Sequence, residues 1–300
     1  GEKFGLWPGT QQWGFEEGYL ERLLTLFEEN AEWLEFLTFS EYLDEFDPLG
    51  RIYLPTASYF EMMEWSLLTP AGRKMEKIAA ELKHQGKFDE YSQFFKGGFF
   101  RNFFVKYPES NNMHKKMLLV SNKLQTLLNA KPLIGEREKE ARLKQARIDL
   151  YKAQCNCAYW HGVFGGLYLN YLRHAVYQHL IRAEVELDNN LHGKKDYVEL
   201  TVTDLDKDGK DEVLLANKYL NLYFAPACGG GLFELDYKPK AFNLTNTLTR
   251  REEVYHHRQA AGVPPLEEGA ASIHDAKGLS KELERALVYD WYPRISLLDH

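Results

Sequence analysis

The middle of the chain has the hydrophobic spacing of helices. Between residues 70 and 190, apolar side chains recur at every third or fourth position, so that each segment presents one apolar face. This spacing predicts long helices over about residues 111–129, 136–153 and 167–187. In the second of them, Glu138 and Arg142 stand four residues apart, the separation at which a helical ion pair forms. We expect these helices to pack into a bundle.

On either side of this region the spacing differs. After Asn190, short apolar segments alternate with polar positions and are separated by turn residues, which is typical of antiparallel strands. Strands are predicted over about residues 197–202, 213–215 and 219–224. Near the start of the chain, a helix is expected over about residues 16–30, followed by a strand-then-helix unit from Trp33 onward. The pattern as a whole predicts an α+β protein, with a helical bundle domain followed by an antiparallel β-sandwich.

Composition and charge narrow the class of protein. The 300 residues are enough for about two domains, and 44% hydrophobic with 27% charged residues is typical of a globular protein. No apolar run approaches the ~20 residues that span a bilayer, so no membrane partner is expected. The net charge of −7 argues against a nucleic-acid partner, and three cysteines do not suggest a disulfide scaffold.

The chain is rich in aromatic residues. Six Trp, 18 Tyr and 18 Phe make up 14% of it, and several stand in polar, glycine-rich surroundings. Aromatic faces beside polar groups suit sugars, whose C–H faces stack while their hydroxyl groups form hydrogen bonds. A large core also needs aromatic side chains, because each can bury 150–250 Å². Composition leaves both explanations open.

One loop between two predicted helices combines aromatic, imidazole and glycine residues. It reads AQCNCAYWHGVFGG over residues 153–166, and it places Trp160 beside His161. Such a loop allows the backbone to approach a ligand closely, but its glycines are equally consistent with a packed helix–helix connection. Cys155, Cys157 and His161 include two kinds of zinc ligand, yet no second pair follows to complete a four-ligand site. We therefore do not predict zinc here.

A second motif is an acidic loop between two predicted strands. Asp204, Asp206 and Asp208 occupy the first, third and fifth positions of a calcium-binding pattern, with a glycine at the sixth. The twelfth position is Leu215 rather than Glu, so this is not an EF-hand loop. Glu212, at the ninth position, is the candidate that completes the set of ligands. A structural calcium site and a solvated Asp-Gly turn remain equal alternatives.

Five segments, taken in order along the chain, carry a family resemblance. They are GEKFGLWPGT (1–10), LPTASY (54–59) with Glu64 and Trp65, FFVKYPESN (103–111), the loop at 153–166, and GGGLFEL (229–235). Together they resemble glycoside hydrolase family 57, specifically its α-amylase and 4-α-glucanotransferase members. The resemblance covers essentially the whole chain.

The resemblance implies a fold and a set of domains. The family is similar to an incomplete (β/α)7 barrel followed by a helical region and a C-terminal β-sandwich. On this basis residues 1–64 would be the C-terminal end of the barrel, residues 65–190 the helical domain, and residues 191–300 part of the sandwich. The chain begins with Gly1 and ends in an apolar stretch, which we interpret as a fragment of a longer protein.

The resemblance also implies an activity for the parent protein. Such enzymes process α-1,4-glucan in carbohydrate metabolism with retention, which needs a nucleophile and an acid/base carboxyl group only ~5 Å apart. The family's acid/base Asp is expected immediately before Gly1 and its nucleophile Glu further upstream, so the chain alone is predicted to be inactive. The sequence does not distinguish a hydrolase from a transferase. A cytoplasmic location and no catalytic cofactor are expected from the family.

By the same resemblance, four residues are expected to bind an α-1,4-glucan or maltooligosaccharide. Glu2 would lie beside the acid/base Asp, Trp7 and Trp160 would stack on glucosyl units, and His161 would be a hydrogen-bonding or orienting group. Many members have Asp where this chain has Cys157, so no polar contact is assigned to that position. The alternative from another functional class is a non-enzymatic carbohydrate-binding or interaction module.

Overall fold

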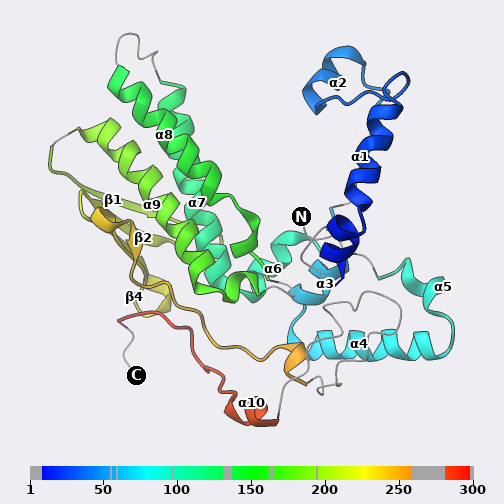
Figure 1. The fold of residues 1–300 in the computed structure, drawn as a ribbon. Coiled ribbons are helices and arrows are strands. Elements are labelled where there is room, and N and C mark those ends of the chain that lie inside the picture. Colours follow the sequence, from blue (N-terminus) through cyan, green and yellow to red (C-terminus); the bar gives the residue numbers. More distant parts are fainter. Residues whose placement is uncertain are drawn as a thin grey trace. The chain divides into compact units, whose positions relative to one another are not determined.

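The computed structural model describes residues 9–54, 56–58, 60–95, 97–130, 137–161, 165–193, 195–257 and 281–297. The chain forms two compact units, and its helices and strands are drawn in Figure 1. Unit 1 comprises Gly1–Thr56 and Tyr255–Arg285, and unit 2 comprises Ala57–Val254 and Ala286–His300. The domain boundaries expected at residues 64 and 190 stay predictions. Among the described residues, no helix is both long and apolar enough to cross a membrane.

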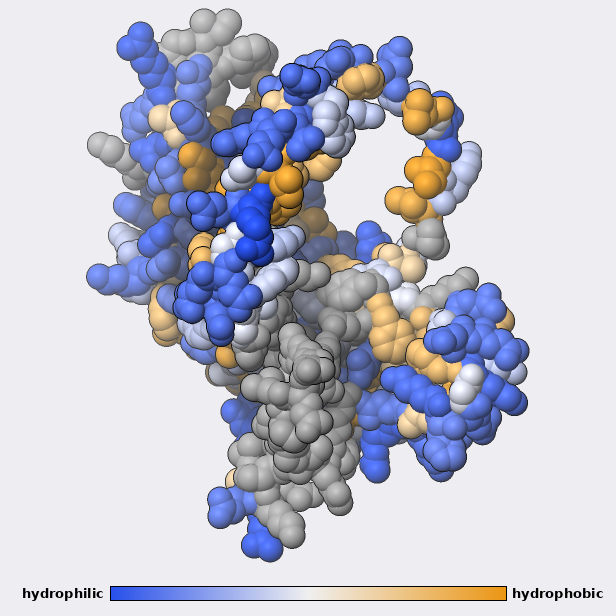
Figure 2. All heavy atoms as spheres, turned by 45° about the vertical axis from the view of Figure 1, so that its right-hand side comes forward, coloured by the Kyte–Doolittle hydropathy of each residue, from blue (hydrophilic) through white to orange (hydrophobic). Residues whose placement is uncertain are grey.

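Unit 1 contains short helices and exposes many hydrophobic side chains. Its helices are η2 (Gln12–Glu16), α1 (Tyr19–Glu29) and α2 (Phe39–Glu45), and α10 (Lys281–Ala286) spans the boundary of the units in the sequence. α2 begins with a capping box, in which the Glu41 amide donates to the Thr38 hydroxyl group and the Thr38 amide donates to the Glu41 carboxylate. α1 buries none of its residues. Figure 2 shows hydrophobic residues, in orange, at the surface of the face that it draws.

The structure confirms the predicted helix near residue 20 and corrects the segment after it. No strand is assigned to residues 9–54, where a strand was expected from Trp33 to the start of α2. An isolated apolar segment does not become a strand unless a neighbouring strand satisfies its backbone groups, and the described part of unit 1 provides none. The barrel end expected over residues 1–64 therefore stays a prediction.

The first part of unit 2 is helical, as the spacing predicted. Its helices are α3 (Phe60–Ser66), α4 (Thr69–His84), α5 (Phe88–Ser92), α6 (Phe100–Lys106), α7 (Pro108–Leu128), α8 (Arg137–Ala153) and α9 (Asn170–His192). α8 and α9 pack against each other, and both contact α7 (Figure 1). Their buried apolar residues, such as Val176, Leu180, Ala183 and Leu187 of α9, recur every three or four positions.

A five-stranded antiparallel sheet follows the helices. Its strands are β1 (Val198–Thr203), β2 (Glu212–Asn217), β3 (Leu220–Ala225), β4 (Gly231–Tyr237) and β5 (Phe242–Asn243), and they lie in sequence order. The antiparallel sheet confirms the β character predicted after Asn190. No second sheet is present among the described residues, so the β-sandwich stays a prediction.

The two faces of this sheet differ in chemistry. On the inner face, Leu214 and Tyr223 form a buried cluster that packs against Leu119 of α7. On the outer face, Leu200, Leu215, Leu222 and Leu235 are register partners on four adjacent strands. Leu200 is exposed and the other three are half-buried, so the outer face presents a row of leucine side chains.

A buried group of charges joins the inner face to the helices. Lys116 of α7 is 0% exposed, and its ammonium group donates to the carboxylates of Glu234 and Asp236 on β4. Its Nζ also lies 3.6 Å from Oε2 of Glu184 on α9. Asn221 of β3 completes the group by donating to both Glu184 (2.6 Å) and Asp236 (3.0 Å). A buried ion is tolerated only when it is paired, so this group ties α7, α9, β3 and β4 together.

The excess of negative charge in this group affects the protonation of Glu234. Three carboxylates surround one ammonium group, so Lys116 does not neutralise all of them. Burial and the charge of Asp236 raise the pKa of Glu234 well above its ordinary value of 4.5, although Lys116 opposes the shift. We infer that Glu234 takes up a proton more readily in the folded protein than in the unfolded chain.

Replacing Glu234 by Gln tests this inference. Because the pKa is raised on folding, the contribution of Glu234 to stability is full below pH 4.5 and is lost as the pH rises through the folded-state value. We expect Glu234→Gln to cost more stability at pH 5 than at pH 8, because the proton that stabilises the folded state is bound at the lower pH. Urea unfolding at both pH values measures the difference. The exposed Glu140→Gln is the control, and an equal cost of Glu234→Gln at both pH values would contradict the inference.

Candidate functional site

The connection from α8 to α9 carries the loop that the sequence singled out. α8 ends at Ala153, a 3-10 turn spans Asn156–Ala158, and a second turn, η4 (Gly166–Tyr168), leads into α9. Trp160 and His161 lie between the two turns, and residues 162–164 lie outside the described residues. The loop belongs to unit 2.

Hydrogen bonds and one glycine fix the backbone around Trp160. The Trp160 carbonyl oxygen accepts from the Leu167 amide at 2.8 Å, and the Tyr159 carbonyl oxygen accepts from the Ser110 hydroxyl group of α7. Gly166 has a φ of +39°, and a Cβ atom there would lie 2.2 Å from the Trp160 oxygen. A side chain at position 166 is therefore excluded both by the backbone conformation and by space. The glycine is required for the turn that holds Trp160.

The neighbouring side chains differ in exposure. Trp160 is half-buried as a residue. His161 is only 1% exposed and packs among rings, with its centroid 4.8 Å from that of Trp65 and 4.9 Å from those of Tyr107 and Tyr168. The sequence allowed His161 either a hydrogen-bonding or an orienting role. Its burial suits the orienting role.

A carboxylate that the sequence did not reveal lies at the centre of these rings. Glu253, in the segment after β5, accepts from the Tyr107 hydroxyl group at 2.5 Å, from Lys106 Nζ at 2.8 Å and from the Tyr168 hydroxyl group. The Tyr107 oxygen also lies 2.5 Å from His161 Nε2. No motif surrounds Glu253 in the sequence, so only the fold identifies it.

The environment of this carboxylate keeps it ionised. Burial acts to raise the pKa of Glu253, but the charges of Lys106 and His161 and the hydrogen bonds from Lys106 and Tyr107 outweigh it and lower the pKa. Burial, together with Tyr168 and Glu253, raises the pKa of the Tyr107 hydroxyl group, which therefore keeps its proton. The cluster thus contains an ionised carboxylate that accepts from the neutral Tyr107 hydroxyl group, the Tyr168 hydroxyl group and the Lys106 ammonium group.

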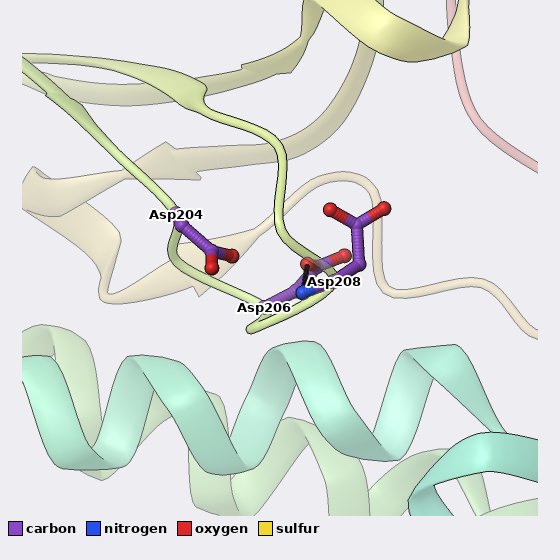
Figure 3. A group of neighbouring side chains, drawn as sticks. All are labelled: Asp204, Asp206 and Asp208. Carbon is purple, nitrogen blue, oxygen red and sulfur yellow. Dashed lines mark hydrogen bonds between the residues drawn. The ribbon is translucent and has the colours of Figure 1, made fainter.

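The acidic loop between β1 and β2 gathers three carboxylates. Oxygens of Asp204, Asp206 and Asp208 lie within 4.8 Å of one another (Figure 3). The carboxylate oxygen Oδ1 of Asp204 is buried and has no hydrogen-bond partner among the described residues. Asn111 of α7 donates to the Asp206 carbonyl oxygen at 2.7 Å, which anchors the loop to the helix.

Glu212 has a different place from the one expected for it. Its Oε2 accepts from the amides of Leu205 (2.7 Å) and Asp206 (3.3 Å), so it holds the loop backbone and is not part of the group of three carboxylates. Burial and the charges of Asp208 and Asp204 raise the pKa of Asp206. Backbone amides also bond to the loop carboxylates, as Lys210 does to Asp208 at 2.8 Å. These bonds are those of an ordinary Asp-Gly turn, so geometry is compatible with both alternatives.

The remaining candidates are Glu2 and Trp7 near the start of the chain and the two cysteines of the loop at residues 153–166. Glu2 and Trp7 lie outside the described residues. Cys155 and Cys157 are free and exposed, and neither joins the buried His161 in a group that could hold a metal within the part of the chain that the structure describes.

Comparison with known proteins identifies the family. The middle domain of alpha-amylase/4-alpha-glucanotransferase matches residues 98–187, and the C-terminal domain of the same family matches residues 204–300. The chain belongs to the alpha-amylase/4-alpha-glucanotransferase family. The resemblance to the α-amylase and 4-α-glucanotransferase members of glycoside hydrolase family 57 is thereby confirmed.

Individual members of the alpha-amylase/4-alpha-glucanotransferase family match the whole chain. It is 43% identical to alpha-amylase 1 of Dictyoglomus thermophilum over 300 residues, which cover 100% of this chain and 41% of that protein. It is also 43% identical to 4-alpha-glucanotransferase of Thermococcus litoralis, with 100% and 42% covered. The crystal structure of the latter enzyme superimposes with a TM-score of 0.70 at 39% identity, over 98% of this chain and 39% of that one. The chain thus spans less than half the length of these relatives.

Proposed function

We propose that the chain is the C-terminal portion of a retaining α-1,4-glucan-processing enzyme, a 4-α-glucanotransferase or α-amylase, and that it helps to bind the glucan. The relatives that match the whole chain carry these two names. The observation that carries the proposal is Trp160, a half-buried residue whose carbonyl oxygen accepts from the Leu167 amide in a turn that requires Gly166. The same proposal includes a cytoplasmic location and a reaction without a catalytic cofactor. It also places the acid/base Asp and the nucleophile Glu outside residues 1–300.

The chemistry assigned to the chain is binding and orientation. Trp160 would offer an apolar ring face to the C–H groups of a glucosyl unit, and hydrogen bonds to the carbonyl oxygens of Tyr159 and Trp160 hold the backbone that carries it. Glu2 and Trp7 are proposed as further glucan-binding residues, with Glu2 beside the acid/base carboxyl group. Holding a sugar in a fixed orientation favours catalysis because the entropic cost of aligning the reacting atoms is met on binding.

We propose that the acidic loop binds a structural calcium ion. Ca²⁺ prefers carboxylate and carbonyl oxygens, and Asp204, Asp206 and Asp208 offer three carboxylates within 4.8 Å of one another. The buried Oδ1 of Asp204, which has no partner among the described residues, is the atom that gains most from a cation. Because Asn111 connects the loop to α7, calcium there would strengthen the contact between the sheet and the helices.

We propose that the outer face of the sheet packs against a second sheet, which would make the sandwich that the sequence predicted. The support is the leucine row across β1 to β4, in which Leu215, Leu222 and Leu235 remain only half-buried. Face-to-face packing of two sheets buries such alternating side chains. The barrel end over residues 1–64 is proposed from the family resemblance alone.

The role of Trp160 is tested by calorimetric titration with maltoheptaose. We expect Trp160→Ala to raise the Kd at least about tenfold, which corresponds to ~1.4 kcal/mol, because stacking is lost. The exposed Trp291→Ala is the control and should leave the Kd unchanged. An unaltered Kd in Trp160→Ala would refute the assignment. If Trp160→Ala abolishes binding while Trp7→Ala has no effect, a separate carbohydrate-binding module is favoured over a shared enzyme cleft.

The calcium proposal is tested by thermal unfolding with calcium and with a chelator. We expect calcium to raise the Tm by several degrees, since a ligand that binds only the folded state stabilises it by about 2.7 kcal/mol at a hundred times its Kd. Asp206→Asn should abolish the rise, whereas Asp211→Asn, an exposed acid in the same loop, should retain it. If the Tm of the unaltered chain is the same in both solutions, the loop is only a turn.

The sandwich is tested in the complete protein by urea unfolding of Leu222→Asn. If the outer face is covered, this substitution should cost about 2–4 kcal/mol, because it removes apolar contacts and buries an amide group. If the face is open to solvent, the cost should stay within about 0.5 kcal/mol, like that of the exposed control Lys218→Asn.

A further inference from the structure

Glu253 contacts the loop of Trp160 from two directions. The Tyr168 hydroxyl group donates directly to its carboxylate, and Tyr168 follows Leu167, whose amide donates to the Trp160 carbonyl oxygen. On the other side, the Tyr107 hydroxyl group connects Glu253 to His161, the residue directly after Trp160. One carboxylate therefore connects to the Trp160 carbonyl oxygen through Tyr168 and Leu167, and to the next residue, His161, through Tyr107.

The hydrogen bonds also set the protonation of His161. A tyrosine hydroxyl group has a single proton, and that of Tyr107 is donated to Glu253 Oε1 at 2.5 Å. The Tyr107 oxygen can then only accept from His161 Nε2, which lies 2.5 Å away. His161 must therefore carry a proton on Nε2. Glu253 Oε1 lies 3.8 Å from His161 Nε2, which is too far for a hydrogen bond. The carboxylate thus selects the protonated nitrogen of His161 through Tyr107.

The segment that carries Glu253 is itself held firmly. The Thr249 amide donates to Glu109 Oε1 at 2.9 Å, and Arg251 pairs with the same carboxylate of α7. The Thr69 hydroxyl group of α4 donates to the Glu252 carbonyl oxygen at 2.5 Å. Lys106 of α6 donates to Glu253 Oε2 and to the Trp65 carbonyl oxygen. Residues of the three helices α4, α6 and α7 therefore hold the segment that carries the Glu253 carboxylate.

We propose that Glu253 is a positioning residue for the glucan-binding indole. Its carboxylate aligns the hydroxyl groups of Tyr107 and Tyr168, and through Tyr107 it fixes the ring of His161, so that Trp160 keeps one orientation toward the sugar. Glu253 does not contact the sugar, because its side chain is buried. This inference rests on the proposed function of Trp160 and adds the group that orients it.

The central experiment compares Glu253→Gln with a buried carboxylate elsewhere. Glu253→Gln keeps the size of the side chain but removes the charge that accepts three donors. Glu234→Gln is the matched control, because Glu234 is equally buried and also bound by a lysine, but it belongs to the Lys116 group. We expect Glu253→Gln to raise the Kd for maltoheptaose about tenfold, the effect of losing one hydrogen bond to a charged group. Glu234→Gln should lower the Tm without changing the Kd.

A spectroscopic measurement separates positioning from general loss of stability. The ring nitrogens of His161, observed by ¹⁵N NMR, should report a proton on Nε2 in the unaltered chain and a different or mixed state in Glu253→Gln. Tyr107→Phe removes only the connecting hydroxyl group and should reproduce the change in both the spectrum and the Kd. This variant provides the test if Glu253→Gln does not fold.

The outcomes are distinct. An unchanged His161 spectrum and Kd in Glu253→Gln, or in Tyr107→Phe, would overturn the positioning role. Equal losses of affinity in Glu253→Gln and Glu234→Gln would also overturn it, since the effect would then follow stability. If the unaltered chain does not bind maltoheptaose at all, the proposed function of Trp160 fails, whereas the His161 spectrum still decides whether Glu253 sets the state of the ring.

Discussion

Buried charge that must be paired is the constraint on which the rest of unit 2 depends. Lys116 of α7 can remain in the interior only because Glu234, Asp236 and Glu184 surround it, and these residues come from β4 and α9. The apolar contacts on the inner face of the sheet do not depend strongly on orientation, whereas each hydrogen bond of Lys116 requires a particular geometry. The ionic group therefore fixes how the sheet sits on the helices.

A second buried carboxylate uses the same principle for a different purpose. Glu253 has Lys106 as its cation and two tyrosine hydroxyl groups as further donors, so its charge is stabilised in the interior. Around it lie the rings that enclose His161, and next to His161 lies the half-buried Trp160. The rigid interior and the partly open indole thus belong to one continuous structure, in which buried charge supports the surface proposed to bind the glucan.

Much of the fold follows from local pattern. The periodic apolar positions located α7, α8 and α9 to within a few residues, and the alternation after Asn190 located the antiparallel strands. Of the site, the sequence found the Trp160 loop and the three aspartates of the acidic loop. It missed Glu253 and assigned Glu212 to a metal set, because nothing in the neighbouring residues indicates which distant amides or hydroxyl groups a carboxylate will meet.

The sequence by itself determined the long helices α7, α8 and α9, the antiparallel strands β1 to β3 and the family to which the chain belongs. These features depend on the spacing of residues that are close together in the chain and on short motifs, both of which are visible in the sequence. Only the tertiary structure decided that His161 is buried, that Lys116 meets three carboxylates and that Glu253 bonds to Tyr107 and Tyr168. Such contacts join residues far apart in the chain, and they exist only after the elements have packed and excluded water from the charges between them.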